Sequence, residues 1–410
     1  SNEVLEEINK INDITSVKIM DENEAKKKGL LQIIGKNVDD EYIDCLKTLC
    51  INPDMVKKIG STMKVVYTPL HGSGNKLVRR ILDGIGFKNV IVVKEQEEPD
   101  PEFSTVKSPN PEEKAAFEIA IKVAQKENAS FVIGTDPDSD RVGVVARNRE
   151  GEFIALTGNQ TGCMLLEYIL SQKKNLGSLP ANGFVVKTIV TTEMARAITK
   201  AYNVELIEVL TGFKFIGEKI KQLDETGKGK YLFGFEESYG YLAGTFARDK
   251  DAVVASMLIA EMAAWYESRN MTLYDGLEEL FEKYGYYLEG ITSFTLEGKT
   301  GIQKIEKAMD YLRNNKLDNF GCCKILAVRD YLKSERTELD SGKVKNIDLP
   351  KSNVMYYELE DSSWFCVRPS GTEPKIKIYY GAKAWNAAES QQKLAELKDN
   401  VVSVIGGLLR

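Results

Sequence analysis

The sequence predicts an α/β fold, with two consecutive α/β three-layer domains that have mixed, mostly parallel sheets, followed by a smaller α+β C-terminal domain. Three observations predict it. Short apolar stretches alternate with longer amphipathic ones from Lys64 onward, the same order returns after the stretch RVGVVA, and strand-like stretches dominate after Gly285. Alternation of this kind builds sheets whose parallel strands are joined by right-handed crossovers.

Length and composition limit the function classes. A chain of 410 residues is too long for one core. The net charge of -6, without charge blocks, argues against nucleic acid as a partner. No apolar run of about 18 residues is present to cross a membrane, and the first residues are too acidic and polar for a secretory signal. The cysteines form no CxxC pair, so we expect reduced thiols and a cytoplasmic location.

The elements of the first half follow from local patterns. Residues 3–50 show helical spacing at Val4, Ile8 and Ile11, and nothing there looks catalytic. The next stretches read in turn as strand, helix, strand, helix and strand: KVVYTPL, NKLVRRILDGIG, NVIVV, PEEKAAFEIAIKVAQKENA and FVIGT. A second unit begins with a helix through Cys163 to Leu170, which we expect Asn159 to cap.

The second half completes that unit and starts a new one. It continues through GFVVKTIV, TTEMARAITKAY, VELIEVLTG and YLFGF to a long helix, Ala252 to Tyr266. Beyond Gly285, strand-like ITSFTL, KILAVRDYL, WFCVRP and KIKIYY surround the helical stretch IQKIEKAMDYLRNN, and a helix from Ala387 to Val404 closes the chain. This order predicts an α+β domain with an antiparallel sheet.

A loop after the strand FVIGT carries Asp136, Asp138 and Asp140. Pro137 blocks a helix, and an extended backbone is expected to point these alternate carboxylates to one side. Three carboxylates so close repel one another unless a cation lies among them, and oxygen ligands suit a hard ion such as Mg²⁺. A solvated acidic turn is the alternative. The position beyond a buried strand favours the metal, since ligands gather at the carboxyl ends of such strands.

A loop near the C-terminus separates two apolar strands and contains Arg368, Ser370, Gly371 and Thr372. It offers a guanidinium, two hydroxyls and backbone amides around a glycine, which are the parts of a phosphate site. A plain hairpin also favours Pro, Ser and Gly, so this loop alone does not choose between the two.

Two loops in the middle of the chain are equally open to two interpretations. Glu236 and Ser238 follow the strand YLFGF, where they form either a simple turn or a contact to sugar hydroxyls. Lys250 lies just before the long helix that Asp251 is expected to cap, either solvated or facing an anion. Single motifs of this size are weak signals.

Basic side chains recur where strands end. Lys187 ends the strand FVVK, and Lys214 lies between a strand and a helix. Several basic groups at strand ends are what binding of a multiply charged anion requires. The only histidine, His71, lies at a strand-to-helix turn, so neither a His-based metal site nor a Ser-His-Asp triad can be built within this chain.

Taken together and in order, these motifs resemble the α-D-phosphohexomutase family, specifically its phosphoglucomutase/phosphomannomutase branch. The motifs are TPLHGSG, PDPEFSTVKSPNPE, GTDPDSDR, KTIVTT, TGFKFIGEKI, GFEESYG, RDKDA and RPSGTEP. The resemblance implies four domains around a cleft and an enzyme that interconverts hexose 1-phosphate and hexose 6-phosphate. It also implies Mg²⁺, a hexose phosphate substrate, and hexose 1,6-bisphosphate as activator and intermediate. GFEESYG favours glucose, with mannose possible.

The resemblance also implies residue roles. Asp136, Asp138 and Asp140 correspond to Mg²⁺ ligands, Arg141 lies beside the phosphoserine, and Lys250 matches a general acid/base. Glu236 and Ser238 contact the sugar, and Lys187 and Lys214 are further cleft cations. The phosphate that is not transferred is held by Arg368, Ser370, Gly371 and Thr372.

One part of the family pattern has no counterpart. The family nucleophile is a serine in a Thr-x-Ser-His-Asn-Pro type loop, and no such string occurs in this sequence. We therefore expect residues 1–35 to be the tail of a missing first domain or a linker. Domain II with the metal loop then spans 36–160, domain III with the sugar loop 161–284, and domain IV with the phosphate loop 285–410. The missing N-terminal domain of the same protein becomes a partner, and the chain alone is expected to be inactive.

Two alternatives remain. The first is a naturally truncated module that binds sugar phosphate without catalysis. The second is a related enzyme, a phosphopentomutase or a hexose-bisphosphate synthase.

Overall fold

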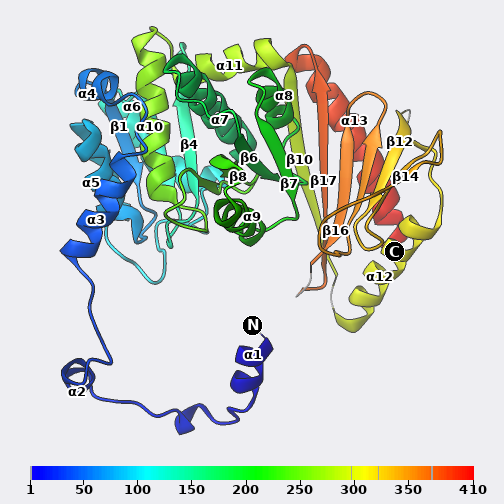
Figure 1. Ribbon diagram of the computed structural model, residues 1–410, viewed down its shortest axis with the longest axis horizontal. Helices are drawn as coiled ribbons and strands as arrows, with labels where there is room; N and C mark the ends of the chain where they lie inside the picture. Colours follow the sequence, from blue (N-terminus) through cyan, green and yellow to red (C-terminus); the bar gives the residue numbers. More distant parts are fainter. Residues whose placement is uncertain (1, 297, 322, 371–372) are drawn as a thin grey trace. The chain divides into compact units, whose positions relative to one another are not determined.

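A computed structural model describes residues 2–296, 298–321, 323–370 and 373–410 (Figure 1). The chain divides into two units, Ser1–Cys45 and Leu46–Arg410. The first unit contains α1 (Asn2–Asn9), the 3-10 turn η1 (Ile14–Ser16), α2 (Glu22–Lys27) and all but the last two residues of α3 (Lys36–Lys47).

Apolar side chains of the first unit are largely exposed to solvent. The exposed ones are Val4, Leu5, Ile8, Ile11, Ile14, Val17, Ile19, Met20, Leu30, Leu31, Ile33, Ile34 and Val38. Exposed apolar surface contributes no burial free energy, so we expect this segment to be less stable than the second unit.

The second unit begins with α4 (Pro53–Gly60) and a five-stranded mixed sheet. Its strand order is β2 (Asn89–Val92), β1 (Lys64–Thr68), β3 (Phe131–Thr135), β4 (Val142–Arg147) and β5 (Phe153–Ala155). β2, β1 and β3 are parallel. β4 is antiparallel to β3, and β5 is antiparallel to β4. Because β3 is buried on both faces, its sequence is continuously apolar rather than alternating.

Helices cover this first sheet. After the short turns η2 (Lys94–Gln96) and η3 (Lys114–Phe117), α6 (Glu118–Glu127) packs on β1 and β3. There Phe117 and Ala120 share a core with Val66 and Val132. α5 (Gly74–Ile85) packs against β2 and against a long central helix.

A second, four-stranded sheet has the order β7 (Glu205–Val209), β6 (Gly183–Thr188), β8 (Lys230–Phe235) and β9 (Tyr241–Leu242). β7, β6 and β8 are parallel, and β9 is antiparallel. α7 (Gly158–Asn175) lies against Phe235, and α9 (Phe213–Thr226) lies against Gly234. Since successive strand residues point to opposite faces, these helices cover the two sides of the sheet. α8 (Met194–Ala201) packs on β7.

The central helix α10 (Ala252–Ser268) joins the two sheets. All its residues from Ala252 to Ala264 are buried, as expected for a helix that is apolar on every side. It packs against α4, α5 and β4, and also against α7, β9 and α11 (Leu273–Tyr284). The predicted cap is confirmed, because the Asp251 side chain accepts hydrogen bonds from the amides of Val253 and Val254.

The expected cap of α7 is wrong by two residues. Thr157 is the N-cap and forms a capping box with Gln160, whereas Asn159 lies inside the helix. Its side chain instead accepts the Thr192 amide at 3.2 Å and donates to Glu289 at 3.1 Å. A Thr-x-x-Gln box satisfies two backbone groups at once and therefore wins over a single Asn cap.

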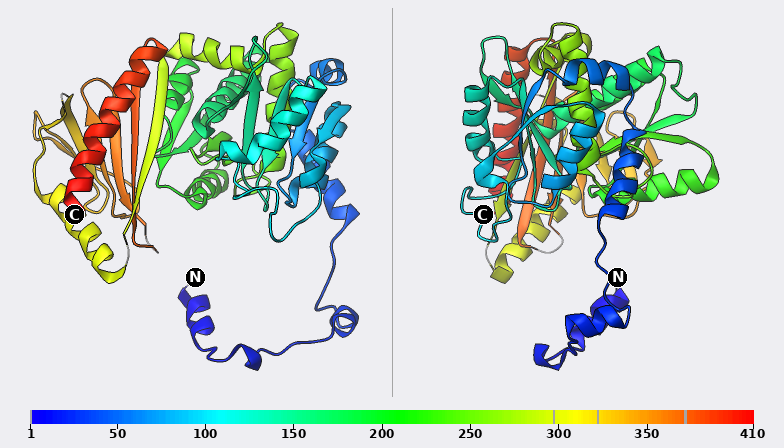
Figure 2. Two further views of the ribbon diagram at one scale, coloured as in Figure 1. Left: turned by 180° about the vertical axis from the view of Figure 1, so that it is seen from behind. Right: turned by 90° about the vertical axis from the view of Figure 1, so that its left-hand side faces the viewer.

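The C-terminal part is an antiparallel sheet covered on one face by α12 (Gly298–Asn314) and α13 (Ala387–Leu408) (Figure 2). The strand order is β10 (Tyr286–Thr295), β17 (Lys375–Ala384), β16 (Trp364–Pro369), β15 (Met355–Leu359), β12 (Cys323–Asp330), β13 (Glu335–Glu338) and β14 (Val344–Asn346), and β11 (Asn319–Phe320) pairs with β12.

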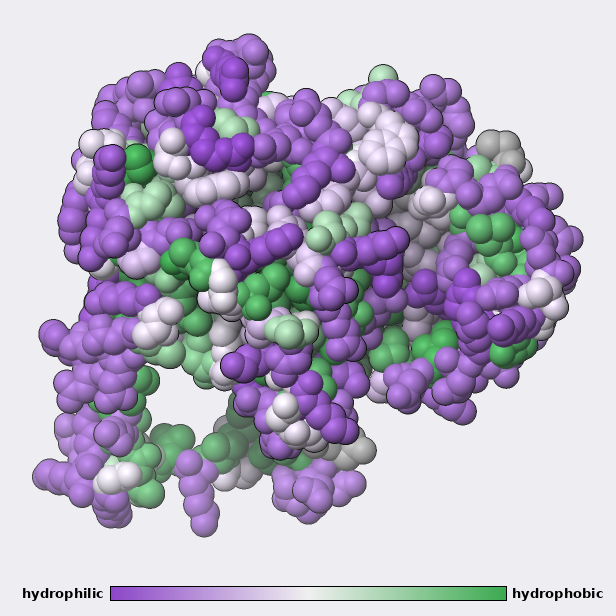
Figure 3. Space-filling view, turned by 45° about the horizontal axis from the view of Figure 1, so that its top comes forward, coloured by the Kyte–Doolittle hydropathy of each residue, from purple (hydrophilic) through white to green (hydrophobic). Residues whose placement is uncertain are grey.

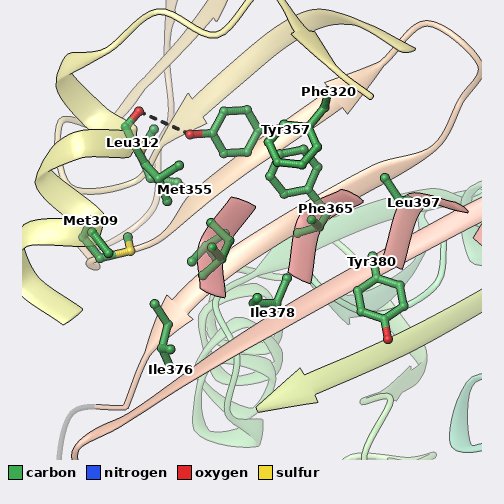
Figure 4. Packing of buried hydrophobic residues seen from close by; sticks show 14 of the residues in the cluster. Met309, Leu312, Phe320, Met355, Tyr357, Phe365, Ile376, Ile378, Tyr380 and Leu397 are labelled. Carbon is green, nitrogen blue, oxygen red and sulfur yellow. Dashed lines mark hydrogen bonds between the residues drawn. The ribbon is translucent and has the colours of Figure 1, made fainter. Parts of the chain in front are cut away.

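Alternate residues of these strands face two different cores. Under α12 and α13, Phe365 lies between Tyr357 and Phe320, at ring-centre distances of 4.4 Å and 4.3 Å (Figure 4). On the other face, Tyr356 and Trp364 pack with residues that follow the second sheet's strands.

The predicted fold class is confirmed, with two α/β parts followed by an antiparallel α+β part. Of the described helices, none combines the length and apolar character needed to cross a membrane. The face drawn in Figure 3 is largely hydrophilic.

Candidate active site

The three aspartates after β3 come together in a tight turn. One carboxylate oxygen of each of Asp136, Asp138 and Asp140 lies within 4.8 Å of the others. The backbone is not extended as expected, because Ser139 adopts a left-handed φ of 58° and its amide donates to the Asp136 carbonyl at 3.0 Å. The amides of Asp140 and Arg141 donate to the Asp136 side chain at 3.0 Å and 2.9 Å. The turn therefore clusters the carboxylates.

Burial makes this cluster electrostatically costly. Asp136 is fully buried, and burial raises the pKa of its carboxyl to about 6, although the Arg141 amide and guanidinium act in the opposite direction. The Arg141 Nε atom lies 2.7 Å from Asp136. Asp138 is exposed and Asp140 is half-buried, so one side of the cluster is open to solvent. A hard divalent cation with water in its remaining positions fits such an oxygen-only, half-open set of ligands.

The loop after β1 contacts the aspartate turn directly. The Ser73 amide donates to the Pro137 carbonyl at 2.8 Å. Gly72 lies so close that a Cβ atom there would be 2.5 Å from the Pro137 Cα. His71 is buried and holds this loop, with its Nε2 atom 2.8 Å from the Thr105 hydroxyl. The histidine therefore has a structural position beside the turn.

The aspartate turn also meets the loop that carries Glu236 and Ser238. Arg141 forms an isolated antiparallel β-bridge with Gly240, and the Val142 amide donates to the Tyr239 carbonyl at 3.1 Å. At the start of α10, the Lys250 ammonium lies 2.8 Å from Asp140. That carboxylate raises the pKa of Lys250, although burial alone would lower it. The structure thus brings Arg141, Lys250 and the aspartates together.

Glu236 is buried at the end of β8 and accepts the Gly212 amide at 2.8 Å. Burial, followed by repulsion from Glu237, raises the pKa of Glu236 to about 7. Glu237 accepts the hydroxyls of Thr188 and Thr191, each at 3.2 Å, and burial raises its pKa too. Burial thus makes the neutral form of both carboxyls more favourable than it is in water.

A cavity of about 330 Å³ opens beside this loop. Its lining includes Ser238, Glu112, Glu289, Lys377 and Tyr379. β10 and β17 thus bring acidic and basic groups to the loop after β8.

Glu112, Glu289 and Lys377 were missed by sequence reasoning. For Glu112 a signal existed, since it belongs to the stretch PNPE, and its carboxylate lies 3.1 Å from Arg141. Lys377 lies in the alternating stretch KIKIYY, where it occupies the face opposite Ile376 and Ile378.

The loop after β16 is described in part. Arg368 lies in β16 opposite Lys377 of β17. The Ser370 amide donates to the Lys375 carbonyl at 2.7 Å, and the Ser370 hydroxyl accepts the Glu373 amide at 3.3 Å. Gly371 and Thr372 lie outside the described residues.

The remaining predicted cations differ in their surroundings. Lys187 is fully buried, and its ammonium lies 2.9 Å from Glu193 and 3.0 Å from Glu208. It also donates to the Thr191 carbonyl at 3.0 Å, so its charge is engaged inside the protein. Lys214 is exposed in the first turn of α9.

Family models of phosphoglucomutase/phosphomannomutase match three stretches of the chain. They are the alpha/beta/alpha domain II at residues 40–151, the alpha/beta/alpha domain III at residues 157–284, and the C-terminal domain at residues 325–403.

Individual proteins are similar over nearly the whole chain. A phosphoglucomutase of Staphylococcus aureus (strain MRSA252) is 39% identical over 359 residues, which are 88% of this chain and 63% of that protein. A solved structure of the Paramecium phosphoglucomutase pp63/parafusin, in its open form, matches with a TM-score of 0.64 at 16% identity, covering 90% of this chain and 62% of that one. An N-acetylphosphoglucosamine mutase of Aspergillus fumigatus in complex with glucose 1,6-bisphosphate matches with a TM-score of 0.51 at 13% identity, covering 92% and 65%. The chain therefore spans less than two thirds of the length of these proteins.

Proposed function

The chain belongs to the phosphoglucomutase/phosphomannomutase family, and on this premise we propose that it carries the metal, sugar and phosphate loops of a phosphohexomutase. The reaction interconverts hexose 1-phosphate and hexose 6-phosphate through a bisphosphorylated sugar, with glucose favoured and mannose possible. Within the proposal, residues 36–160, 161–284 and 285–410 are domains II, III and IV.

The convergence of the aspartate turn with the loop after β8 is the observation that supports this best. Two backbone contacts join these loops, and Lys250 reaches Asp140 across the same junction. Phosphoryl transfer depends mostly on positioning and on stabilising negative charge. A site that places carboxylates, a guanidinium and an ammonium within a few ångströms of one another has the required groups.

In this proposal Asp136, Asp138 and Asp140 hold Mg²⁺, which when bound supplies positive charge against a phosphoryl oxygen. Arg141 fixes the turn through Asp136 and presents its guanidinium at the phosphoserine. Lys250, whose ammonium lies 2.8 Å from Asp140, exchanges a proton with the sugar hydroxyl.

The sugar and its second phosphate lie toward the C-terminal sheet in this proposal. Glu236 and Ser238 contact the hydroxyls, and Arg368 and Ser370, together with Gly371 and Thr372, hold the phosphate that is not transferred. The Aspergillus complex supports a bisphosphorylated sugar as ligand of this fold.

Two lysines complete the proposed site. Lys214 is a further cation at the cleft. We assign Lys187 a positioning role, since it holds the Thr188–Thr191 turn whose hydroxyls bind Glu237.

Turnover requires a phosphoserine, and this sequence contains no Thr-x-Ser-His-Asn-Pro loop. We therefore propose that residues 1–410 bind substrate and that catalysis needs a serine loop supplied from outside them. The test measures conversion of glucose 1-phosphate to glucose 6-phosphate with Mg²⁺ and catalytic glucose 1,6-bisphosphate. It compares residues 1–410 with a protein restored to the length of its relatives.

Activity in the restored protein and its absence in residues 1–410 would support the proposal. Inactivity of both proteins toward glucose and mannose phosphates would contradict the hexomutase assignment. Activity on a pentose phosphate alone would instead favour a phosphopentomutase.

A further inference from the structure

A second cavity lies on the C-terminal sheet, away from the aspartate turn. Its volume is about 430 Å³, and it lies between α8 and the strands β10, β12, β15, β16 and β17. No residue that we propose for the metal, sugar or phosphate contacts lines it. Pockets of this size accept small metabolites.

Basic side chains outnumber acidic ones around this cavity. The charged side chains that line it are Arg196, Lys200, Arg329, Lys383, Glu193 and Glu358. The lining thus has two more basic than acidic side chains, although the net charge of the whole chain is -6. A positive cavity on a negative protein concentrates anions locally.

Both carboxylates of the lining are already paired. Glu193 lies 2.9 Å from the buried Lys187 and 2.8 Å from Arg196. Glu358 lies 2.6 Å from Arg329 and 2.7 Å from Arg336. Both carboxylates are therefore neutralised by these basic side chains, and neither is available to pair with Lys200 or Lys383.

The two lysines form no ion pair within the described part of the chain. The Lys383 ammonium lies over the rings of Tyr287 and Trp385, at 4.8 Å from each centre, and Lys200 is exposed on α8. An ammonium that lies over aromatic rings and has no ion pair can move to an anion at small cost, because cation–π contacts at exposed sites are weak. The free positive charge of the cavity is thus Lys200 and Lys383.

We propose that this cavity is an anion site for a small phosphate monoester, separate from the mutase site. The phosphate lies between Lys200 and Lys383. The Nε and Nη2 atoms of Arg196 are already paired with Glu193 and Glu208, so the two lysines supply the positive charge. Ser362, also in the lining, offers a hydroxyl. A volume of about 430 Å³ exceeds what one phosphate needs, so a short polar body is expected on the ester oxygen. This inference does not depend on the proposed mutase activity.

The test is calorimetric titration at low ionic strength with glycerol 3-phosphate and, separately, inorganic phosphate. An Arg368→Ala background weakens the proposed phosphate loop, so that the second site is measured by itself. In that background, Lys200→Met/Lys383→Met removes the two free cations and keeps their apolar stems. Lys122→Met on α6, an exposed lysine in the first α/β part, is the matched control for loss of charge.

The Arg368→Ala protein is expected to bind one glycerol 3-phosphate per chain with a Kd below about 1 mM. The double variant should weaken binding at least tenfold, and Lys122→Met should change it less than twofold. Absence of saturable binding, binding unaffected by the double variant, or an equal loss in the control would each overturn the proposal. If the double variant unfolds, Lys200→Met alone decides, since the Lys200 side chain is exposed. Inorganic phosphate that binds as tightly as the ester would overturn the monoester assignment, because the polar body would then contribute nothing.

Discussion

Replacing Gly72 by alanine should disturb the aspartate turn without altering any proposed ligand side chain. An ideal Cβ at residue 72 would lie 2.5 Å from the Cα and 2.6 Å from the carbonyl oxygen of Pro137, and 2.8 Å from the carbonyl oxygen of Asp136. All three are backbone atoms, so no side chain can rotate away. Ordinary contact needs a separation of roughly 1 Å more, and the turn must move by that distance.

Overpacking of this kind costs about 1–3 kcal/mol. For a domain of this size each kcal/mol lowers the Tm by about 2–4 °C, so Gly72→Ala is expected to lower it by about 2–12 °C. The displaced turn should also hold Mg²⁺ less well, and the rise in Tm that Mg²⁺ produces should shrink.

Differential scanning calorimetry with and without Mg²⁺ measures both effects. Gly84→Ala, in α5, is the matched control, because its Cβ would meet only the flexible end of the Lys47 side chain at 2.9 Å. Alanine inside a helix should leave the Tm unchanged or raise it slightly. Equal Tm values for Gly72→Ala and wild type, with the same Mg²⁺ response, would refute the reasoning.

Three further changes have distinct expected results. In a protein that carries the phosphoserine, Lys250→Met should lower kcat at least ~100-fold, whereas the exposed Lys221→Met should leave kcat unchanged. A kcat of Lys250→Met within a factor of three of wild type would rule out proton transfer by Lys250. Because burial raises the pKa of Glu236 to about 7, its carboxylate is lost as the pH falls through 7. Affinity for glucose 1-phosphate should therefore drop about tenfold from pH 8 to pH 6. Glu236→Gln should remove this drop, and any change that remains belongs to the phosphate. Phe365→Ala, which empties the space beside Tyr357, should cost about 3–5 kcal/mol in urea unfolding, and a loss below about 1 kcal/mol would contradict the packing.

Most of the fold could be predicted because its signals are local. The alternation of apolar and amphipathic stretches is enough to place the strands and helices, and the run from Ala252 onward is apolar on every side because α10 is buried. Asp251 is an N-cap by its position alone. The cap of α7 was misassigned because two candidates lie two residues apart, and only the reciprocal bonds of Thr157 and Gln160 decide between them.

The site was less predictable, since its contacts are distant in sequence. Three aspartates at alternate positions suggested a strand-like backbone, but the left-handed Ser139 and the amides donated to Asp136 form a turn that brings the same carboxylates together. Nothing local reveals that Lys187 is paired with Glu208, or that Lys377 reaches the cavity beside Ser238. Those contacts depend on how strands far apart in the chain are arranged.

The metal site is the part of the proposal that one measurement tests most directly. Isothermal titration of Mg²⁺ into residues 1–410 and into Asp138→Asn compares the full set of carboxylates with one that lacks a single charge. Asp138 is exposed, so its replacement leaves the buried contacts of Asp136 in place. We predict one Mg²⁺ per chain for the wild type and at least tenfold weaker binding for Asp138→Asn. No saturable binding to the wild type, or equal affinity of the two proteins, would contradict a metal site at this turn.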